Sequence, residues 1–221
     1  MRFDILTIFP KIFQSYFDDS IIKRAQNKKL VTIKIHDLRD GAKDKHRATD
    51  DRPYGGGPGM VMKVEPIYNT LKKIGAVKSK KAASHRVILL TPQGNTLTQK
   101  TVKRLSKYKI ITLICGRYEG FDERVRSLVD EQISIGDYVL TGGELPAMVV
   151  VDTLARFVPG VLGHDGSVKD ESFSKSLQTL EYPQYTRPEI FRRKRVPPIL
   201  LSGNHQLISE WRKKHQRTKH R

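Results

Sequence analysis

Three short segments of this chain combine an apolar run with glycines in a way that could hold a ligand on bare main chain. They are Leu90-Thr91-Pro92-Gln93-Gly94, Cys115-Gly116-Arg117-Tyr118-Glu119-Gly120 and the glycine-rich stretch 135–146. Because glycine lacks a Cβ, a ligand can approach its backbone closely, and the chain can adopt dihedral angles that other residues avoid. If the three apolar runs are neighbouring strands, the loops that follow them form one pocket lined by backbone.

A second group of residues could do acid–base chemistry. Asp170 and Glu171 are adjacent in a polar segment, and Arg156 stands near the end of an apolar, helix-like run. Such carboxylates are usually surface charge, and such an arginine usually interacts with the helix dipole. The functional alternative is a carboxylate that becomes a general base when a closed cleft desolvates it, with Arg156 as its electrophilic partner. The residues alone leave both interpretations open.

Other segments argue against a phosphate-binding loop, a zinc site and a disulfide. The run Gly55-Gly56-Gly57-Pro58-Gly59 is followed by Met60 rather than the Lys-Ser/Thr of a phosphate-binding loop, which favours a flexible loop. The seven histidines lack the spacing of a zinc site, so no metal site is predicted. The single cysteine, Cys115, excludes an internal disulfide, and its position after an apolar run predicts a buried thiol.

The elements that would position these residues alternate between strand and helix patterns. Apolar runs predict strands at 3–9, 31–36, 86–90, 109–115 and 132–135. Helical spacing predicts helices at 12–28, 60–74, 98–105, 121–129 and 145–157, with a polar loop from 37 to 59. Continuous apolar strands separated by helices are typical of an α/β fold with a mostly parallel sheet.

The length of 221 residues suits one ordinary domain with a small appendage. The composition changes after Pro159-Gly160, which predicts a catalytic domain at 1–162, a flexible linker at 163–177 and a small basic helical domain at 178–221. Helices are expected in that last domain at 187–191 and 202–214. We expect a soluble cytoplasmic protein, since no run approaches the roughly 20 apolar residues of a membrane span.

The formal net charge of +18 indicates a polyanionic partner, with nucleic acid as the leading candidate. A basic surface from a lysine-rich genome is the simpler alternative. The charge is unevenly distributed, however. From Pro66 to Tyr118 the chain has twelve Lys or Arg and no Asp or Glu, whereas 187–221 has eleven basic residues against two acidic ones.

Longer motifs resemble one known family. The runs Asp50-Asp51-Arg52-Pro53-Tyr54-Gly55, Gly116-Arg117-Tyr118-Glu119-Gly120, Ile135–Pro146 and Tyr185-Thr186-Arg187-Pro188 look like those of the bacterial tRNA (guanine-N1-)-methyltransferases, which modify guanine 37 beside the anticodon. The resemblance extends over roughly residues 1–212. It implies a SPOUT-type domain with a deep trefoil knot, S-adenosylmethionine as methyl donor, Mg²⁺ as a further expectation, and a homodimer that binds tRNA.

The resemblance also implies site residues. By matching position, the cofactor site comprises Leu90, Pro92, Gly116, Glu119, Ser134, Ile135, Gly136, Asp137, Tyr138, Val139, Leu140, Gly142 and Pro146. The general base of the family is an Asp in an Asp-Ser-Phe motif, and an Arg assists it. The matching residues are Glu171 and Arg156, so Glu replaces the usual Asp, and the adjacent Asp170 is the alternative base.

Two other functions remain as alternatives. A non-catalytic RNA-binding protein on the same fold would also explain the charge pattern and the changed base, but it would not need the glycine loops of a cofactor pocket. A related SPOUT enzyme acting on ribosomal RNA or on a ribose hydroxyl would lack the Tyr185-Thr186-Arg187-Pro188 module.

Overall fold

The computed structural model describes residues 1–78, 81–163, 171–173, 176 and 178–218. The chain divides into two compact units, Met1–Asp165 and Gly166–Arg221. The first unit contains a five-stranded sheet in the order β2-β1-β6-β5-β7, and every neighbouring pair of its strands is parallel. This confirms the predicted α/β fold. The linker at 163–177 stays a prediction, since most of it lies outside the described residues.

The strands of this sheet begin close to the apolar runs of the sequence, but the strand predicted at 86–90 continues through the expected loop to Thr96. They are β1 (Arg2–Thr7), β2 (Thr32–Asp37), β5 (His85–Thr96), β6 (Ile110–Cys115) and β7 (Glu131–Ser134). The side chains of β1, β5 and β6 alternate between two apolar clusters, one on each face, which explains why strands buried on both sides are continuous apolar runs in the sequence.

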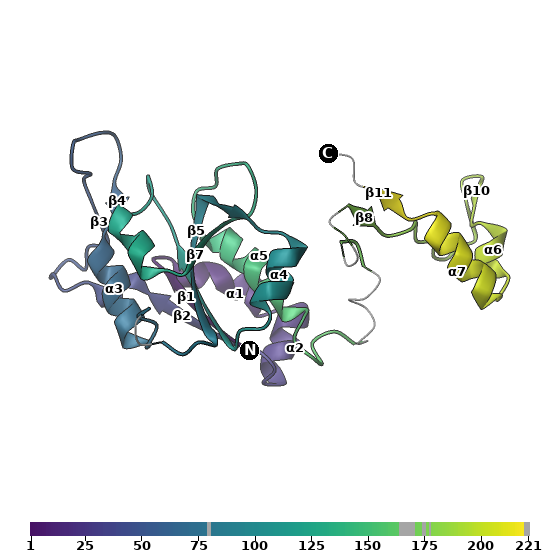
Figure 1. The fold of residues 1–221 in the computed structure, drawn as a ribbon, viewed down its shortest axis with the longest axis horizontal. Helices are drawn as coiled ribbons and strands as arrows, with labels where there is room; N and C mark the ends of the chain where they lie inside the picture. Colours follow the sequence, from purple (N-terminus) through teal and green to yellow (C-terminus); the bar gives the residue numbers. More distant parts are fainter. Residues whose placement is uncertain (79–80, 164–170, 174–175, 177, 219–221) are drawn as a thin grey trace. The chain divides into compact units, whose positions relative to one another are not determined.

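Helices cover both faces of the sheet (Figure 1). One face packs against η1 (Pro10–Phe13), α1 (Gln14–Phe17), α2 (Ser20–Asn27), α4 (Gln99–Leu105) and α5 (Glu144–Ala155). The other face packs against η2 (Leu38–Gly41), α3 (Val64–Lys73) and η3 (Glu123–Leu128). The largest apolar contribution comes from α5, which buries Ala147, Val150, Val151, Leu154 and Ala155.

Three helices differ from their predicted bounds for local reasons. The predicted helix at 12–28 is divided, because Asp19 is extended and its side chain accepts a hydrogen bond from the Ser20 N–H, capping a new helix. The helix expected from residue 60 begins at Val64, because β4 (Val61–Met62) pairs with β3 (Asp50–Asp51). The helix expected at 121–129 is the shorter 3₁₀ segment η3.

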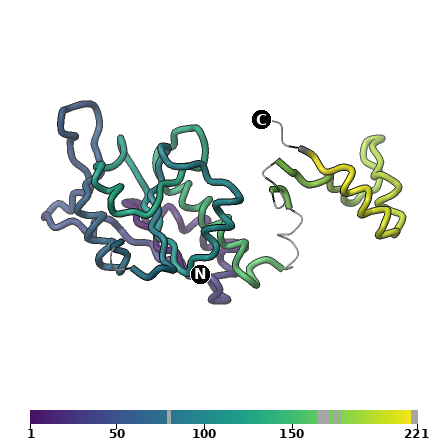
Figure 2. Tube along the Cα trace, viewed as in Figure 1, coloured from purple at the N-terminus to yellow at the C-terminus, as the bar shows by residue number. Residues whose placement is uncertain are grey.

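The polar loop predicted at 37–59 is mostly irregular, apart from η2 and from β3, which pairs with β4 to form a short hairpin with a long tip. The chain between β3 and β4 projects from the body of the first unit (Figure 2). A Cβ added at Gly55, Gly56 or Gly57 would meet nothing within 4 Å, and Tyr54 is fully exposed. The tip of the hairpin therefore has no packing partner among the described residues.

The second unit contains β8 (Thr179–Leu180), β9 (Ile190–Phe191), β10 (Lys194–Arg195), α6 (Pro198–Leu201), α7 (His205–Lys214) and β11 (Arg217–Thr218). The predicted helix at 187–191 was wrong, since β9 pairs antiparallel with β10. Arg192 and Arg193 between them have φ of 45° and 64°, the left-handed conformation of a two-residue hairpin turn. The helix predicted at 202–214 is present as α7.

Candidate cofactor and substrate site

The carboxyl ends of β6 and β7 lie on either side of the middle of β5. Leu90 of β5 is in register with Cys115 of β6 and with Ile133 of β7. Ligands of parallel α/β sheets bind where such strand ends meet. The loops after β6 and β7, together with the part of β5 where its pairing with β7 is irregular, enclose a cavity of about 340 Å³, close to the lower end of the range for small-molecule sites.

The structure brings together most of the residues predicted to hold the cofactor. Those that line the cavity are Leu90, Pro92, Gly116, Glu119, Ser134, Ile135, Gly136, Tyr138, Val139, Leu140, Gly142 and Pro146. Asp137 is not among the lining residues. The convergence of the three loops is therefore observed, whereas the ligand that they bind remains a prediction.

Two of the loops touch main chain to main chain. The Gly143 N–H donates a hydrogen bond of 2.9 Å to the Gly116 carbonyl. A Cβ at Gly143 would come within 2.7 Å of both the Cys115 Cα and the Gly116 nitrogen. Real Cβ contacts are not that short, and neither partner atom is a flexible side chain. Only glycine at position 143 permits this approach.

The loop after β7 is held by its own hydrogen bonds. The Ser134 hydroxyl donates to the Gly136 carbonyl at 2.8 Å and accepts from the Gly136 N–H at 3.2 Å. The Tyr138 hydroxyl donates to the Ile135 carbonyl at 3.3 Å, and its ring covers the space that a Cβ at Gly136 would need. These contacts fix the turn with bonds between neighbouring residues.

The glycine-rich hairpin is attached to the cavity by its base. The Met62 N–H donates to the Gly120 carbonyl at 2.9 Å, and the Glu119 N–H donates to the Met60 carbonyl at 3.0 Å. The Glu119 side chain also packs directly on Gly59, where a Cβ would lie 2.6 Å from the Glu119 Cγ. The hairpin base and the loop after β6 therefore form one connected structure.

The sequence did not predict the buried polar network next to the cavity. Glu144, the first residue of α5, is 2% exposed. One of its carboxylate oxygens accepts from the Thr7 hydroxyl at 2.7 Å, and the other accepts from the Arg117 Nε at 3.0 Å. The available signal was a carboxylate at the first position of a helix whose next seven residues are all apolar.

Cys115 is buried and carries a free thiol, as its sequence position predicted. Burial raises the pKa of this thiol well above its ordinary value, and the nearby Glu144 carboxylate raises it further. The thiol is therefore kept in its protonated, unreactive form. Among the described residues, no group of three or more His, Cys, Asp or Glu side chains could hold a metal ion.

The predicted acid–base residues lie in different parts of the chain. Arg156 is the C-cap of α5, whereas Gly143 and Pro146 of the cavity lie at the start of that helix. The twelve residues of α5 span about 18 Å, so Arg156 and the cavity of the same chain are at opposite ends of the helix. Glu171 belongs to the second unit, and Asp170 lies outside the described residues.

The Glu171 segment has a defined local structure. The Ser172 N–H donates to the Glu181 carboxylate at 3.2 Å, and the Glu181 N–H donates to the Ser172 hydroxyl at 3.1 Å. The Phe173 N–H donates to the Thr179 carbonyl at 2.7 Å. These bonds tie the residues that follow Glu171 to β8 and to Glu181, the residue after it.

The chain matches the model of the tRNA (Guanine-1)-methyltransferase TrmD family over residues 1–221. The chain belongs to this family.

Curated relatives agree with the family match over almost the whole chain. A tRNA (guanine-N(1)-)-methyltransferase of Dictyoglomus turgidum is 56% identical over 214 residues, covering 97% of this chain and 84% of the relative. The protein of the same name from Geobacillus kaustophilus is 54% identical over 215 residues, covering 97% and 86% respectively. That of Geobacter sulfurreducens is 54% identical over 214 residues, covering 96% and 85%.

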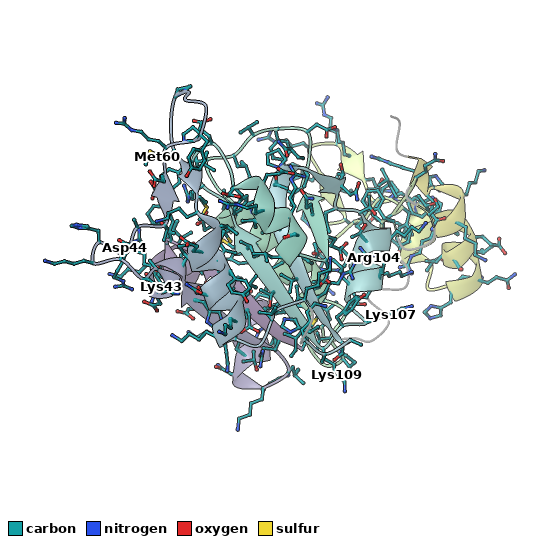
Figure 3. All side chains as sticks on the ribbon, turned by 60° about the vertical axis from the view of Figure 1, so that its left-hand side comes forward. Lys43, Asp44, Met60, Arg104, Lys107 and Lys109 are labelled. Atoms are coloured by element: carbon teal, nitrogen blue, oxygen red, sulfur yellow. The ribbon has the colours of Figure 1, made fainter. Side chains whose placement is uncertain are left out.

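Family membership makes the chain a methyltransferase, and such a family implies S-adenosylmethionine as methyl donor. Exposed cations suited to an RNA partner are present in the first unit. Lys107 and Lys109 lie on the segment that leads from α4 into β6, whereas Arg104 on α4 is exposed but pairs with Glu131 (Figure 3).

The second unit of this family member combines aromatic and basic side chains. Trp211 stacks on His215 at 4.1 Å and meets Tyr185 edge-on, and the Arg212 guanidinium lies over the Tyr182 ring. Within the described ranges, no helix of either unit is both long and apolar enough to cross a membrane.

Proposed function

We propose that this protein transfers a methyl group from S-adenosylmethionine to N1 of guanine 37 in tRNA, the position 3′ to the anticodon. The observation that carries the proposal is the convergence of three glycine loops on one cavity in a chain of the tRNA (Guanine-1)-methyltransferase family. A protein that only binds RNA would not need such a cavity.

The residues around the cavity fit a nucleoside cofactor. Part of its wall is main chain, because Gly116, Gly142 and Gly143 expose the backbone of two loops, and larger side chains such as Phe121 and Tyr138 complete the lining. Backbone N–H and C=O groups can recognise the edge of an adenine without charged side chains. When bound, S-adenosylmethionine supplies an electrophilic methyl group attached to a sulfonium centre.

The chemistry requires a base and a cation near the guanine. Guanine N1 carries a proton and is a poor nucleophile until that proton leaves. We assign Glu171 to accept this proton, with Asp170 as the alternative, and Arg156 to stabilise the negative charge that develops on O6. The local hydrogen bonds around Ser172 and Glu181 support a fixed position for the Glu171 backbone.

A homodimer is part of the proposal. The two ends of α5 separate Arg156 from the cavity of its own chain, so a cavity of a second chain is the simpler place for it to act. An exposed apolar stripe on the same helix supports this assembly, since Leu145 and Val149 are 56% and 40% exposed. Phe9, Ile12 and Tyr16 add to the exposed apolar surface of the first unit.

Several finer features follow from the family resemblance. We propose a deep trefoil knot at the C-terminal end of the first unit, and a small basic helical domain, 178–221, that binds tRNA. Its helix α7 and its stacked aromatic residues support the second of these. Mg²⁺ is proposed as an activating ion, and a tRNA substrate implies work in the cytoplasm.

The decisive experiment measures methyl incorporation into two tRNA transcripts that differ only in guanine or adenine at position 37. We expect incorporation into the guanine transcript alone, with the product mapped to N1. Glu171→Ala and Arg156→Ala should each lower the rate by about 100-fold or more, since general acid–base catalysis contributes on that scale, while cofactor binding is retained.

Two results would redirect the proposal. Full activity of Glu171→Ala together with inactivity of Asp170→Ala would move the base by one residue. No calorimetric binding of S-adenosylmethionine, with tRNA binding intact, would instead favour the non-catalytic RNA-binding protein.

A further inference from the structure

The carboxylate of Glu144 joins three segments that are distant in sequence. Thr7 ends β1, Arg117 follows β6, and Glu144 begins α5 after the loop from β7. Glu144 accepts one hydrogen bond from each of the other two side chains, at 2.7 Å from Thr7 and 3.0 Å from Arg117. The Thr7 hydroxyl in turn accepts from the Phe9 N–H at 2.9 Å, which fixes its direction.

Arg117 carries this connection to the wall of the cavity. Its Nη1 donates to the Thr141 carbonyl at 3.1 Å. Its side chain fills the space beside Gly142, where a Cβ would lie 2.6 Å from the Arg117 Cδ. Its guanidinium also lies over the Phe9 ring, 4.7 Å from the centroid. Thr141, Gly142 and Arg117 itself line the cavity, so Arg117 is part of the wall that it holds in place.

Stability alone does not account for a buried ion pair here. Replacing such a pair with well-packed apolar side chains is often neutral or stabilising, because desolvating the charges is costly. The positive end of α5 and two charge-assisted hydrogen bonds offset this cost for Glu144. The arrangement instead controls geometry. The planar guanidinium of Arg117 bonds both the Glu144 carboxylate and the Thr141 carbonyl, and this fixes the distance between the loop after β6 and the loop after β7.

We propose that Glu144 is a positioning residue for cofactor binding, which holds Arg117 so that the Thr141–Gly142 main chain stays in place against the loop after β6. Thr7 orients the Glu144 carboxylate from behind. This inference rests on the proposed function, because it assigns the cavity to S-adenosylmethionine. Neither Thr7 nor Glu144 lines the cavity, so both act through Arg117.

Thr7→Val is the sharpest test, because it removes one buried hydroxyl at nearly constant volume and lies outside the cavity. We expect the Kd for S-adenosylmethionine, measured by calorimetry on the full chain, to rise about tenfold, the loss expected for one hydrogen bond to a charged group. The KM for the cofactor should rise similarly, while kcat at saturating cofactor stays unchanged. Thr7→Ser should restore both values.

The matched control is Thr70→Val in α3. Thr70 is equally buried, its hydroxyl donates to the Pro66 carbonyl within its own helix, and it does not line the cavity. This variant should keep the wild-type Kd. Equal weakening by Thr7→Val and Thr70→Val would mean a general loss of stability and would overturn the inference.

Glu144→Gln keeps the shape of the carboxylate and provides the test if Thr7→Val does not fold. It should also weaken cofactor binding by about tenfold or more, because the charge that orients Arg117 is lost. Wild-type affinity in Glu144→Gln or in folded Thr7→Val would overturn the positioning role and leave the proposed function intact. If the wild-type chain itself does not bind S-adenosylmethionine, the proposed function fails and this inference fails with it.

Discussion

Gly143 illustrates how a single hydrogen atom in place of a side chain can create a binding site. The loop after β7 lies on the loop after β6 because Gly143 brings no Cβ to the contact, and its N–H bonds the Gly116 carbonyl. Arg117 packs on the neighbouring Gly142 in the same way. The two adjacent glycines thus contact different groups: Gly143 contacts backbone, and Gly142 contacts the Arg117 side chain. Their value lies in close approach rather than in unusual dihedral angles.

Gly143→Ala is therefore expected to separate the two loops. The added methyl group would meet backbone atoms at 2.7 Å, which cannot rotate away, so the variant should lose about 1–3 kcal/mol of stability. Cofactor affinity should fall by more than tenfold in calorimetry. Gly163→Ala is the control, since its Cβ would meet nothing within 4 Å. Wild-type binding by Gly143→Ala would show that the loops can move apart without loss.

At the scale of elements, β7 is tied to its neighbours by a partly buried carboxylate as well as by the sheet. Glu131 accepts a 2.7 Å hydrogen bond from the Arg86 Nε on β5 and a second one, at 3.1 Å, from the Arg104 Nη1 on α4. Burial alone would raise the pKa of Glu131, but the bonds from Arg104 and Arg86 outweigh it and lower the pKa. The charged form therefore stabilises the edge of the sheet that carries the last cavity loop.

This link predicts a pH-dependent stability. Because the folded pKa of Glu131 is lowered, its contribution is complete above the ordinary value of 4.5 and is lost as the pH falls through the folded pKa. Glu131→Gln should cost on the order of 2 kcal/mol at pH 7 in urea unfolding, and the difference from wild type should shrink below pH 4.5. Glu123→Gln is the control, because that carboxylate is 81% exposed and its pair with Arg126 should contribute at most about 1 kcal/mol. A constant deficit at all pH values would contradict the assignment.

The elements that could be predicted were those with a strong local pattern. Continuous apolar runs located the strands of the sheet, and glycine motifs located the three loops. The break at Asp19 and the turn at Arg192 and Arg193 were missed, because one capping side chain or two left-handed residues leave no periodicity. The Thr7–Glu144 bond joins residues 137 positions apart, so no local signal could reveal it.

At the scale of the whole molecule, the two units differ in how they are stabilised. The fully buried apolar residues of the described chain all lie between Phe3 and Ala155, in the first unit. The described part of the second unit has basic and aromatic side chains but no fully buried residue. The first unit therefore has a conventional packed core. The described part of the second unit has no such core and exposes most of its surface to solvent or to a partner.

The proposed dimer predicts complementation between two inactive variants. Arg156→Ala chains keep an intact cavity, and Gly143→Ala chains keep Arg156, so mixed dimers should contain one complete site. Co-expression with two different tags, followed by tandem purification, would isolate the mixed dimers. We expect up to about half of the wild-type methylation rate from one site of two. Complete inactivity of a folded mixed dimer would place Arg156 and the cavity of the same chain in one site.

The position of Cys115 has a practical consequence. It is the sole cysteine of the chain, and it lies under Gly143 at the point where the two loops meet. Because its side chain is fully buried, we expect a thiol reagent to react only when the structure around it opens, so the labelling rate would report on that opening. Ligands that close the loops should slow the reaction, which would allow screening on the unmodified protein without a fluorophore.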